Sequence, residues 1–223
     1  MNLHISHQPD AKHTIERVLP MKYLYNPSER ASDPTFLLLH GTGGNERDLL
    51  PIAQDIKINN GVLAVKGNVD EDGNARFFKR FADGSPDITD MVERTDELNA
   101  FVNKAAQTHD FDRDNVIALG YSNGANIATS LLFHHEASLK GAILLHPFVP
   151  RKDIQLPDLT GVSIFISAGA TDTLVLPGEA VQLKKMLEQA GADVKLYLTD
   201  AGHTLVNSEI EAATEWYKAH FEV

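Results

Sequence analysis

The amino-acid sequence predicts an α/β fold: a mostly parallel central sheet covered by helices on both faces, without a large cap domain. One observation behind this is the alternation of short apolar runs with longer amphipathic runs along the chain. Another is the motif Gly-x-Ser-x-Gly at residues 120–124, where an apolar run ends and an amphipathic run begins. The third is size, because 223 residues, 43% of them hydrophobic and 23% charged, are enough for one full core.

The organisation of the chain indicates a single domain over residues 1–223. No internal repeat, low-complexity tract or linker divides the sequence. Residues 1–12 are polar and contain histidines, and we expect this segment to be flexible or to lie on the surface. The histidines lack the spacing of a ligand motif, so we predict no metal site and no cofactor.

Charge and cysteine content argue against several functions. The formal net charge of −11 disfavours nucleic acid or an anionic membrane as a partner. The absence of cysteine excludes disulfides, thiolate metal sites and a cysteine nucleophile. The N-terminus lacks the basic and apolar regions of a signal peptide, and no run reaches membrane-spanning length. We therefore expect a cytoplasmic protein.

The predicted strands are short apolar runs bounded by turn residues. Residues 14–26 alternate imperfectly around Pro20, which suits one or two edge strands. The further predicted strands are Thr35–Leu39, Gly61–Lys66, Val116–Leu119, Gly141–Leu145, Val162–Ala168 and Val194–Leu198.

The predicted helices are amphipathic runs with recognisable ends. We expect Ser85 to cap a long helix that begins with Pro86 and ends at Ala106. The others are Arg47–Ile56, a helix from Asn126 onward, Pro177–Ala190 ended by Gly191, and Ser208–Phe221.

The Gly-x-Ser-x-Gly motif places Ser122 at the turn between a buried strand and a helix. Such a turn is tight and strained, and it pushes the serine hydroxyl out at the carboxyl end of the sheet. The motif alone is short enough to occur by chance. The strand before it and the helix after it make Ser122 a candidate nucleophile.

A serine nucleophile needs a base and an acid that holds the base. In folds with this elbow the chain order is serine, acid, histidine. Asp172 and His203 follow later predicted strands, so both lie at the same edge of the sheet as Ser122. Asp200 is a weaker candidate for the acid because it is only three residues from His203.

A glycine-rich loop, residues 41–44, follows the strand Thr35–Leu39. It lacks the Gly-Lys-Ser/Thr of a P-loop, and Glu46 stands where a dinucleotide fingerprint needs glycine. We interpret it as a loop that presents an N–H to an oxyanion, with Thr42 and Asn123 as the two donors. The alternative is a plain turn whose glycines only allow positive φ.

The long segment 67–81 is charged, rich in turn residues, and aromatic at its end. Long loops after strand ends often line binding sites. We therefore predict a substrate wall that includes Arg76, Phe77, Phe78 and Phe81, although phenylalanines that pin the loop to the core would fit equally well. Gly41 and His146 complete the predicted substrate contacts, and His146 could instead support the catalytic residues from behind.

The segments Leu37–Glu46, Gly120–Gly124, Ala170–Asp172 and Gly202-His203 together resemble the carboxylesterase/phospholipase branch of the α/β-hydrolases, which includes acyl-protein thioesterases. Arg76–Arg80 and Leu145–Pro147 are similar to small bacterial carboxylesterases of the hydroquinone-stress type. The resemblance implies carboxylic-ester hydrolysis of a small-molecule ester by Ser122, Asp172 and His203.

Two departures from related groups bear on the substrate. Acyl-protein thioesterases usually carry glutamine after the serine, whereas this chain has Asn123. Dienelactone hydrolases are expected to use a cysteine nucleophile, which the chain lacks. A thioesterase or lysophospholipase-like hydrolase and a non-catalytic ligand-binding protein remain alternatives. A homodimer is also possible.

Overall fold

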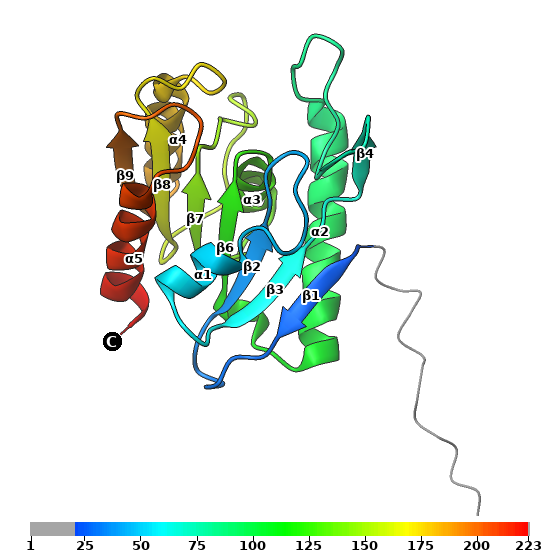
Figure 1. Ribbon diagram of the computed structural model, residues 1–223, viewed down its shortest axis with the longest axis vertical. Helices are drawn as coiled ribbons and strands as arrows, with labels where there is room; N and C mark the ends of the chain where they lie inside the picture. The colour runs from blue at the N-terminus through cyan, green and yellow to red at the C-terminus, as the bar shows by residue number, and fades with distance from the viewer. Residues whose placement is uncertain (1–20, 223) are drawn as a thin grey trace, which may run out of the picture.

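A sheet of seven strands forms the centre of the computed structural model, which describes residues 21–222 (Figure 1). Its strand order is β1-β3-β2-β6-β7-β8-β9, and every pairing is parallel except that of the edge strand β1 with β3. The strands are β1 (Tyr23–Asn26), β2 (Thr35–Leu39), β3 (Gly61–Val65), β6 (Val116–Tyr121), β7 (Gly141–Leu145), β8 (Ser163–Gly169) and β9 (Asp193–Thr199). The predicted α/β fold with a mostly parallel sheet is confirmed.

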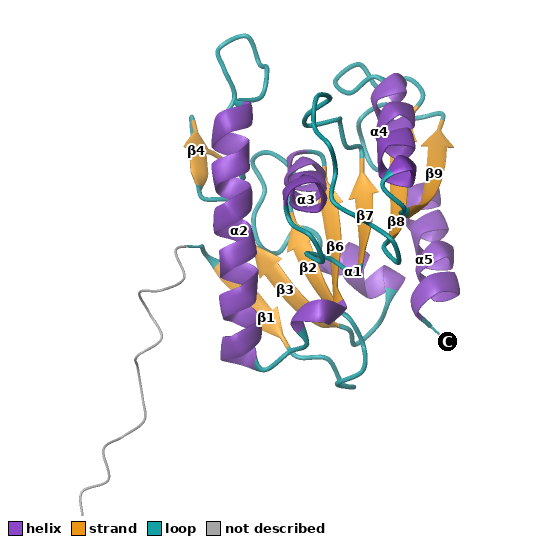
Figure 2. Ribbon diagram, turned by 180° about the vertical axis from the view of Figure 1, so that it is seen from behind, coloured by secondary structure: helices purple, strands orange, loops and turns teal. Residues whose placement is uncertain are grey.

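Helices cover both faces of the sheet (Figures 1 and 2). On one face lie α1 (Leu50–Ile56) and α5 (Asn207–Phe221), and on the other lie α2 (Ile88–His109), α3 (Asn123–His134) and α4 (Pro177–Gln189). A hydrophobic core lies on each face of the sheet. Alternate residues of one strand contribute to the two cores, because successive side chains of a strand point to opposite faces. In β2, Leu37 packs with α2 and α3, whereas Phe36 packs with α5.

The segment predicted as a long loop contains a small hairpin. Its strands are β4 (Val69–Glu71) and β5 (Asn74–Arg76), which pair antiparallel and stand apart from the main sheet. In Figure 1 the hairpin lies beside α2, near the end of the sheet toward which the parallel strands point. A short 3₁₀ helix, Arg113–Asn115, leads into β6.

Helix α2 begins later than predicted. Asp87, not Ser85, caps it, because the Asp87 side chain accepts from the N–H of Asp90 while Ser85 hydrogen-bonds to Asp83. Pro86 forms an isolated antiparallel β-bridge with Arg80, so it precedes the helix and is not part of it. The prediction failed because Ser85 and Asp87 are both good caps, and tertiary contacts decide between them.

The first predicted edge strand and the N-terminal segment 1–12 lie outside the described residues. Within residues 21–222 no segment forms a cap domain over the sheet. None of the described helices has the length and apolar character needed to cross a membrane.

Candidate active site

Ser122 occupies a strained turn between β6 and α3. Its backbone has φ +50° and ψ −111°, a conformation that a residue with a side chain rarely adopts. The glycines of the motif allow this turn, since a Cβ on Gly124 would lie 1.8 Å from the Leu39 carbonyl oxygen. A Cβ on Gly120 would lie 2.6 Å from the Gly124 oxygen. The backbone thus has the geometry of a nucleophile elbow.

The structure brings Ser122, His203 and Asp172 into one hydrogen-bonded chain. The Nε2 atom of His203 lies 2.8 Å from the Ser122 Oγ, and its Nδ1 lies 2.7 Å from the Asp172 Oδ2. The Tyr121 hydroxyl donates to the His203 carbonyl oxygen at 2.8 Å and fixes the loop after β9. Asp200 is exposed and, among the described residues, makes no hydrogen bond to His203.

Asp172 is held as an anion by its surroundings. Burial raises the pKa of its carboxyl group, but hydrogen bonds from the Val175 N–H, His203, His146 and the Leu174 N–H outweigh burial and leave the pKa below its usual value. The Leu174 and Val175 amides donate to Oδ1 at 2.8 and 3.0 Å, which leaves Oδ2 to the histidines. Asp172 can therefore orient His203 and stabilise a positive charge on it.

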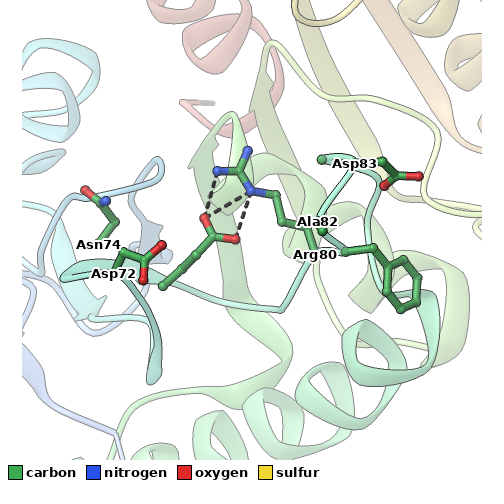
Figure 3. A pocket seen from close by; sticks show the side chains of 8 residues that line it. Asp72, Asn74, Arg80, Ala82 and Asp83 are labelled. Carbon is green, nitrogen blue, oxygen red and sulfur yellow. Dashed lines mark hydrogen bonds and ion pairs between the residues drawn. The ribbon is translucent and has the colours of Figure 1, made fainter.

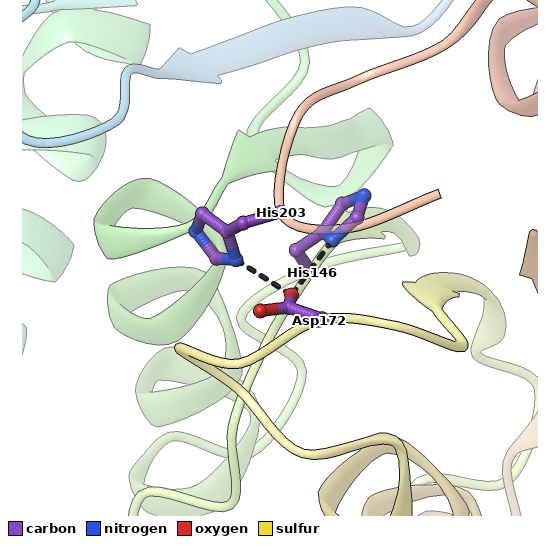
Figure 4. Close-up of side chains that lie close together, drawn as sticks. All are labelled: His146, Asp172 and His203. Carbon is purple, nitrogen blue, oxygen red and sulfur yellow. Dashed lines mark hydrogen bonds and ion pairs between the residues drawn. The ribbon is translucent and has the colours of Figure 1, made fainter. Parts of the chain in front are cut away.

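His146 does not line the cleft, contrary to the prediction that it contacts substrate. Its side chain is 0% exposed, with Nδ1 3.2 Å from the Asp172 Oδ2 and Nε2 2.8 Å from the Glu209 Oε1. Figure 4 shows His203 and His146 converging on the same oxygen of the Asp172 carboxylate, Oδ2. The two carboxylates hold the ring behind the acid, which agrees with the alternative interpretation of His146 as a supporting residue.

Glu209 was not predicted as part of the site. In the sequence it is one acidic residue in the first turn of a helix, where acids are common on the surface. In the structure it is 0% exposed, and its Oε2 accepts from the Val206 N–H at 2.9 Å. Its burial depends on how α5 packs, so no local pattern in the sequence indicated it.

The donor atoms of His146, Asp172 and His203 lie within 4.8 Å of one another, a spacing that could suit a metal ion. However, each imidazole nitrogen of the two histidines already faces Ser122, Asp172 or Glu209 at hydrogen-bond distance. Hydrogen bonding therefore accounts for these three residues without a metal ligand role.

The two predicted oxyanion donors lie on neighbouring strand ends. Thr42 follows β2, and Asn123 is the first residue of α3 after β6, the strand that pairs with β2. The N–H groups at a helix start have no acceptor within the helix, and they carry its partial positive charge. Within residues 21–222, neither the Thr42 nor the Asn123 N–H is used in a backbone hydrogen bond outside the helices and strands. Both are therefore available to an oxyanion.

Three consecutive residues, Ala75–Phe77, hold both donor residues, and we call them the clamp. The Ala75 carbonyl accepts from the Gly43 N–H at 2.9 Å, and the Arg76 Nη1 donates to the Thr42 Oγ1 at 2.7 Å. The Phe77 N–H donates to the Asn123 Oδ1 at 2.7 Å. The clamp thus ties the loop after β2 to the start of α3.

His40 fixes the same loop from behind. The Gly67 N–H donates to its Nε2 at 3.0 Å, so the proton sits on Nδ1, which donates to the Gly41 carbonyl at 2.6 Å. Burial lowers the pKa of His40, which favours this neutral form. Phe77 packs against the His40 ring at 4.9 Å between centroids.

A cleft of about 850 Å³ opens in front of Ser122. Of the residues predicted to bind substrate, Arg76 and Phe78 line it. Phe77 is buried against His40, and Gly41 lies under the Tyr121 ring, where a Cβ would come within 2.9 Å of that ring. Neither Phe77 nor Gly41 lines the cleft, because both serve to pack the loops. The apolar residues of the cleft are Phe78, Pro86, Phe148, Val149, Leu174, Val175 and Leu176.

A second hollow of about 510 Å³ adjoins the cleft at the tip of the β4–β5 hairpin (Figure 3). Arg80 lines both spaces and forms an ion pair with Glu71 at 2.8 Å. Phe81, which we predicted to form part of the substrate wall, lines this hollow and not the cleft, and it is exposed.

The comparisons with known proteins agree with this fold and site. Residues 23–220 match the dienelactone hydrolase family. The chain is 50% identical over 198 residues to the hydrolase MhqD of Bacillus subtilis (strain 168), covering 89% of this chain and 98% of that protein. It matches a crystal structure of a Bacillus cereus carboxylesterase with a TM-score of 0.89 at 50% identity, over 91% of this chain and 95% of that one. A structure of YahD with malic acid matches with a TM-score of 0.85 at 31% identity, over 90% and 99% of the two chains.

The protein is a hydrolase of the dienelactone hydrolase/carboxylesterase type. More specifically, the chain belongs to the dienelactone hydrolase family. The matched range includes the elbow with Ser122 and also His203. The lack of a cysteine nucleophile therefore does not set the chain apart from this family, which corrects that expectation. The resemblance to small bacterial carboxylesterases is confirmed.

Proposed function

We propose that this protein is a serine carboxylesterase that cleaves esters of short to medium acyl chains through an acyl-enzyme. The observation that carries the proposal is the hydrogen-bonded chain from the Ser122 Oγ through His203 to Asp172. A serine hydroxyl becomes an effective nucleophile when a base within hydrogen-bond reach takes its proton and an acid holds that base.

In the first half-reaction the Ser122 Oγ attacks the acyl carbon while its proton moves to the His203 Nε2. Asp172 stabilises the imidazolium that forms. The negative charge that develops on the carbonyl oxygen meets the N–H groups of Thr42 and Asn123 and the N-terminus of α3. When the tetrahedral intermediate collapses, the C–O bond to the alcohol breaks and His203 protonates the departing oxygen.

In the second half-reaction water replaces the alcohol. His203, now neutral, takes a proton from the water, whose oxygen attacks the acyl-enzyme carbonyl at the same oxyanion site. Collapse of this intermediate breaks the bond to the Ser122 Oγ, returns the proton to the serine and releases the carboxylic acid. No further reactant is required.

The lining of the cleft supports a modest acyl group. Phe78, Phe148 and Val149 are apolar, and the stretch Leu174–Leu176 adds an apolar rim in which Leu174 and Leu176 are exposed. Burying an acyl chain against these residues contributes about 0.8 kcal/mol per methylene group. The charged residues Lys152 and Glu179, which pair with each other at 2.6 Å, also line the cleft, so its lining is not wholly apolar.

The test is hydrolysis of p-nitrophenyl acetate, butyrate, octanoate and laurate by the wild-type protein and by Ser122→Ala, with a chelator present. We expect turnover of the shorter esters by wild type and background rates for Ser122→Ala, since loss of a triad serine costs about 10⁶ in kcat. Ser32→Ala changes an exposed serine far along the chain from the elbow and is the matched control. Thioesters of the same acyl groups, if hydrolysed faster, would favour the thioesterase alternative. Equal, background-level rates for wild type and Ser122→Ala would overturn the proposal.

A further inference from the structure

The catalytic steps above leave two buried ionisable residues, His146 and Glu209, without a role. His146 follows β7 in a positive-φ conformation, and Glu209 lies in the first turn of α5. Both side chains are 0% exposed, and with Asp172 they form a line of three ionisable groups. Burying ionisable groups costs folding free energy unless each is paired, so a buried group of this kind indicates a role beyond packing.

The geometry favours a doubly protonated His146. Its Nδ1 faces the Asp172 Oδ2 at 3.2 Å, and its Nε2 faces the Glu209 Oε1 at 2.8 Å. A neutral imidazole carries one N–H, so one ring nitrogen would point a lone pair at a carboxylate oxygen. The doubly protonated ring donates to both carboxylates and avoids this repulsion.

The remaining polar groups around His146 do not compete with this assignment. The His203 ring lies 5.2 Å away and the Tyr121 ring 6.0 Å away, both edge-on to His146. The Tyr121 hydroxyl is engaged with the His203 carbonyl. The groups that face His146 are thus Asp172 from the loop after β8, Glu209 from α5, His203 from the loop after β9, and Tyr121 from β6.

The charges in this line add up to the charge of one carboxylate. Burial raises the pKa of the Asp172 and Glu209 carboxyl groups, but their hydrogen bonds outweigh burial and leave both pKa values below their usual range, so each group carries a negative charge. The His146 imidazolium carries a positive one. His203 therefore faces a net charge of minus one, as it would next to an isolated aspartate. The difference is that His146 also contacts the Asp172 Oδ2 and holds the carboxylate in place. Glu209 also accepts a hydrogen bond from the N–H of Val206, which is three residues after His203. The three ionisable groups therefore stabilise the loop that carries His203.

We propose that His146, as a buried imidazolium between Asp172 and Glu209, is a positioning residue that ties the catalytic acid and the base loop to helix α5. The proposal rests on the proposed function, since it assigns a role in that triad. The direction of the pKa shift supports the proposal. Burial lowers the pKa of His146, but the contacts with Glu209 and Asp172 outweigh burial and leave that pKa above its usual value.

The first test does not depend on activity. Nitrogen-15 NMR of histidine-labelled Ser122→Ala protein reports the protonation of each ring, and His146→Gln identifies the His146 signals by their loss. We expect both ring nitrogens of His146 to carry protons at neutral pH and to keep them well above the usual histidine range. A His146 ring with one unprotonated nitrogen at neutral pH would overturn the proposal, whether or not the protein hydrolyses esters.

The second test is the pH dependence of kcat/KM for Glu209→Gln and for His146→Gln with Glu209→Gln. Glu209→Gln leaves a buried cation beside Asp172 without its second partner, which disfavours a further proton on His203. We expect the midpoint of the acid limb to fall by about half a pH unit or more. The double variant removes both charges and is expected to restore the wild-type midpoint. A loss of kcat/KM with the same midpoint in all three proteins would mean that Glu209 is merely structural, and would contradict the proposed charge balance.

Discussion

The two sides of the candidate site are built by different means. On the acid side, Asp172 and the buried residues behind it are charged groups that are fixed by pairing with one another. On the oxyanion side, the donors are neutral backbone N–H groups, and the clamp Ala75–Phe77, which is the end of the β4–β5 hairpin and the residue after it, fixes them through hydrogen bonds. Buried charges need partners, whereas backbone dipoles need only a rigid loop. Substitutions on the two sides should therefore differ in their effects on kcat and on stability.

Of the substitutions that compare the two sides, the largest effect is expected on the acid side, from Asp172→Asn. The amide keeps the shape of the side chain but removes the charge and favours the wrong tautomer of His203, which costs about 10⁴ in kcat in comparable triads. The measurement is steady-state hydrolysis of p-nitrophenyl butyrate. Asp200→Asn is the control, since Asp200 is exposed and its backbone, not its carboxylate, contacts Thr171. A smaller loss for Asp172→Asn than for Asp200→Asn would contradict the assignment of the acid.

A smaller effect is expected on the oxyanion side, from Arg76→Met. Loss of the Nη1 contact to Thr42 loosens one donor without deleting it. We expect kcat to fall by about ten- to a hundredfold, below the 10²–10³ that follows loss of a whole donor. Arg76→Lys should lose nearly as much, because an ammonium group cannot reach the Phe78 carbonyl and Thr42 together as the guanidinium does. A change confined to KM would show that Arg76 binds substrate instead of holding the loop.

Asn123→Ala tests the other end of the clamp. The Phe77 N–H would lose its acceptor in a buried place, which costs about 1–3 kcal/mol in unfolding free energy. We expect a lower Tm together with a loss of kcat of about tenfold, because the backbone donor of residue 123 remains in place. Thermal unfolding and ester hydrolysis of the same preparation check both values. Unchanged stability would contradict the role assigned to the Phe77–Asn123 contact.

The smallest effect is a change of stability with pH on the acid side. The pKa of His146 is raised, so above about pH 6.5 the folded protein keeps a proton that the unfolded chain releases. The unfolding free energy should therefore fall with increasing pH, by at most about 1.4 kcal/mol per unit, until pH passes the folded pKa. His146→Gln should remove this slope, as measured by urea unfolding at several pH values. An equal slope in both proteins would indicate a different titrating group.

The same contrast explains what the sequence could and could not predict. Ser122, Asp172 and His203 each follow a predicted strand, and parallel strands place their carboxyl ends at one edge, so topology alone brings these residues together. The Thr42 and Asn123 donors follow from the same rule.

The sequence did not indicate Glu209, and it left the roles of Phe77 and His146 open, because burial decides these roles. Glu209 has the pattern of a surface acid in a first helical turn, and the sequence of the loop fitted a cleft wall and a core contact equally well for Phe77. Both residues are buried by contacts with distant segments. For His146, the sequence allowed both a cleft residue and a support. Only the contact between His146 and Glu209 of α5 separates the two.

The central claim is that Ser122 is the nucleophile. The most direct measurement is intact-protein mass spectrometry after reaction with diethyl p-nitrophenyl phosphate, followed by mapping of the modified peptide. We predict a single diethylphosphoryl adduct on Ser122, absent in Ser122→Ala, unchanged in Ser32→Ala and formed far more slowly in Asp172→Asn. No adduct on the folded wild-type protein, or equal labelling of Ser122→Ala, would contradict the account.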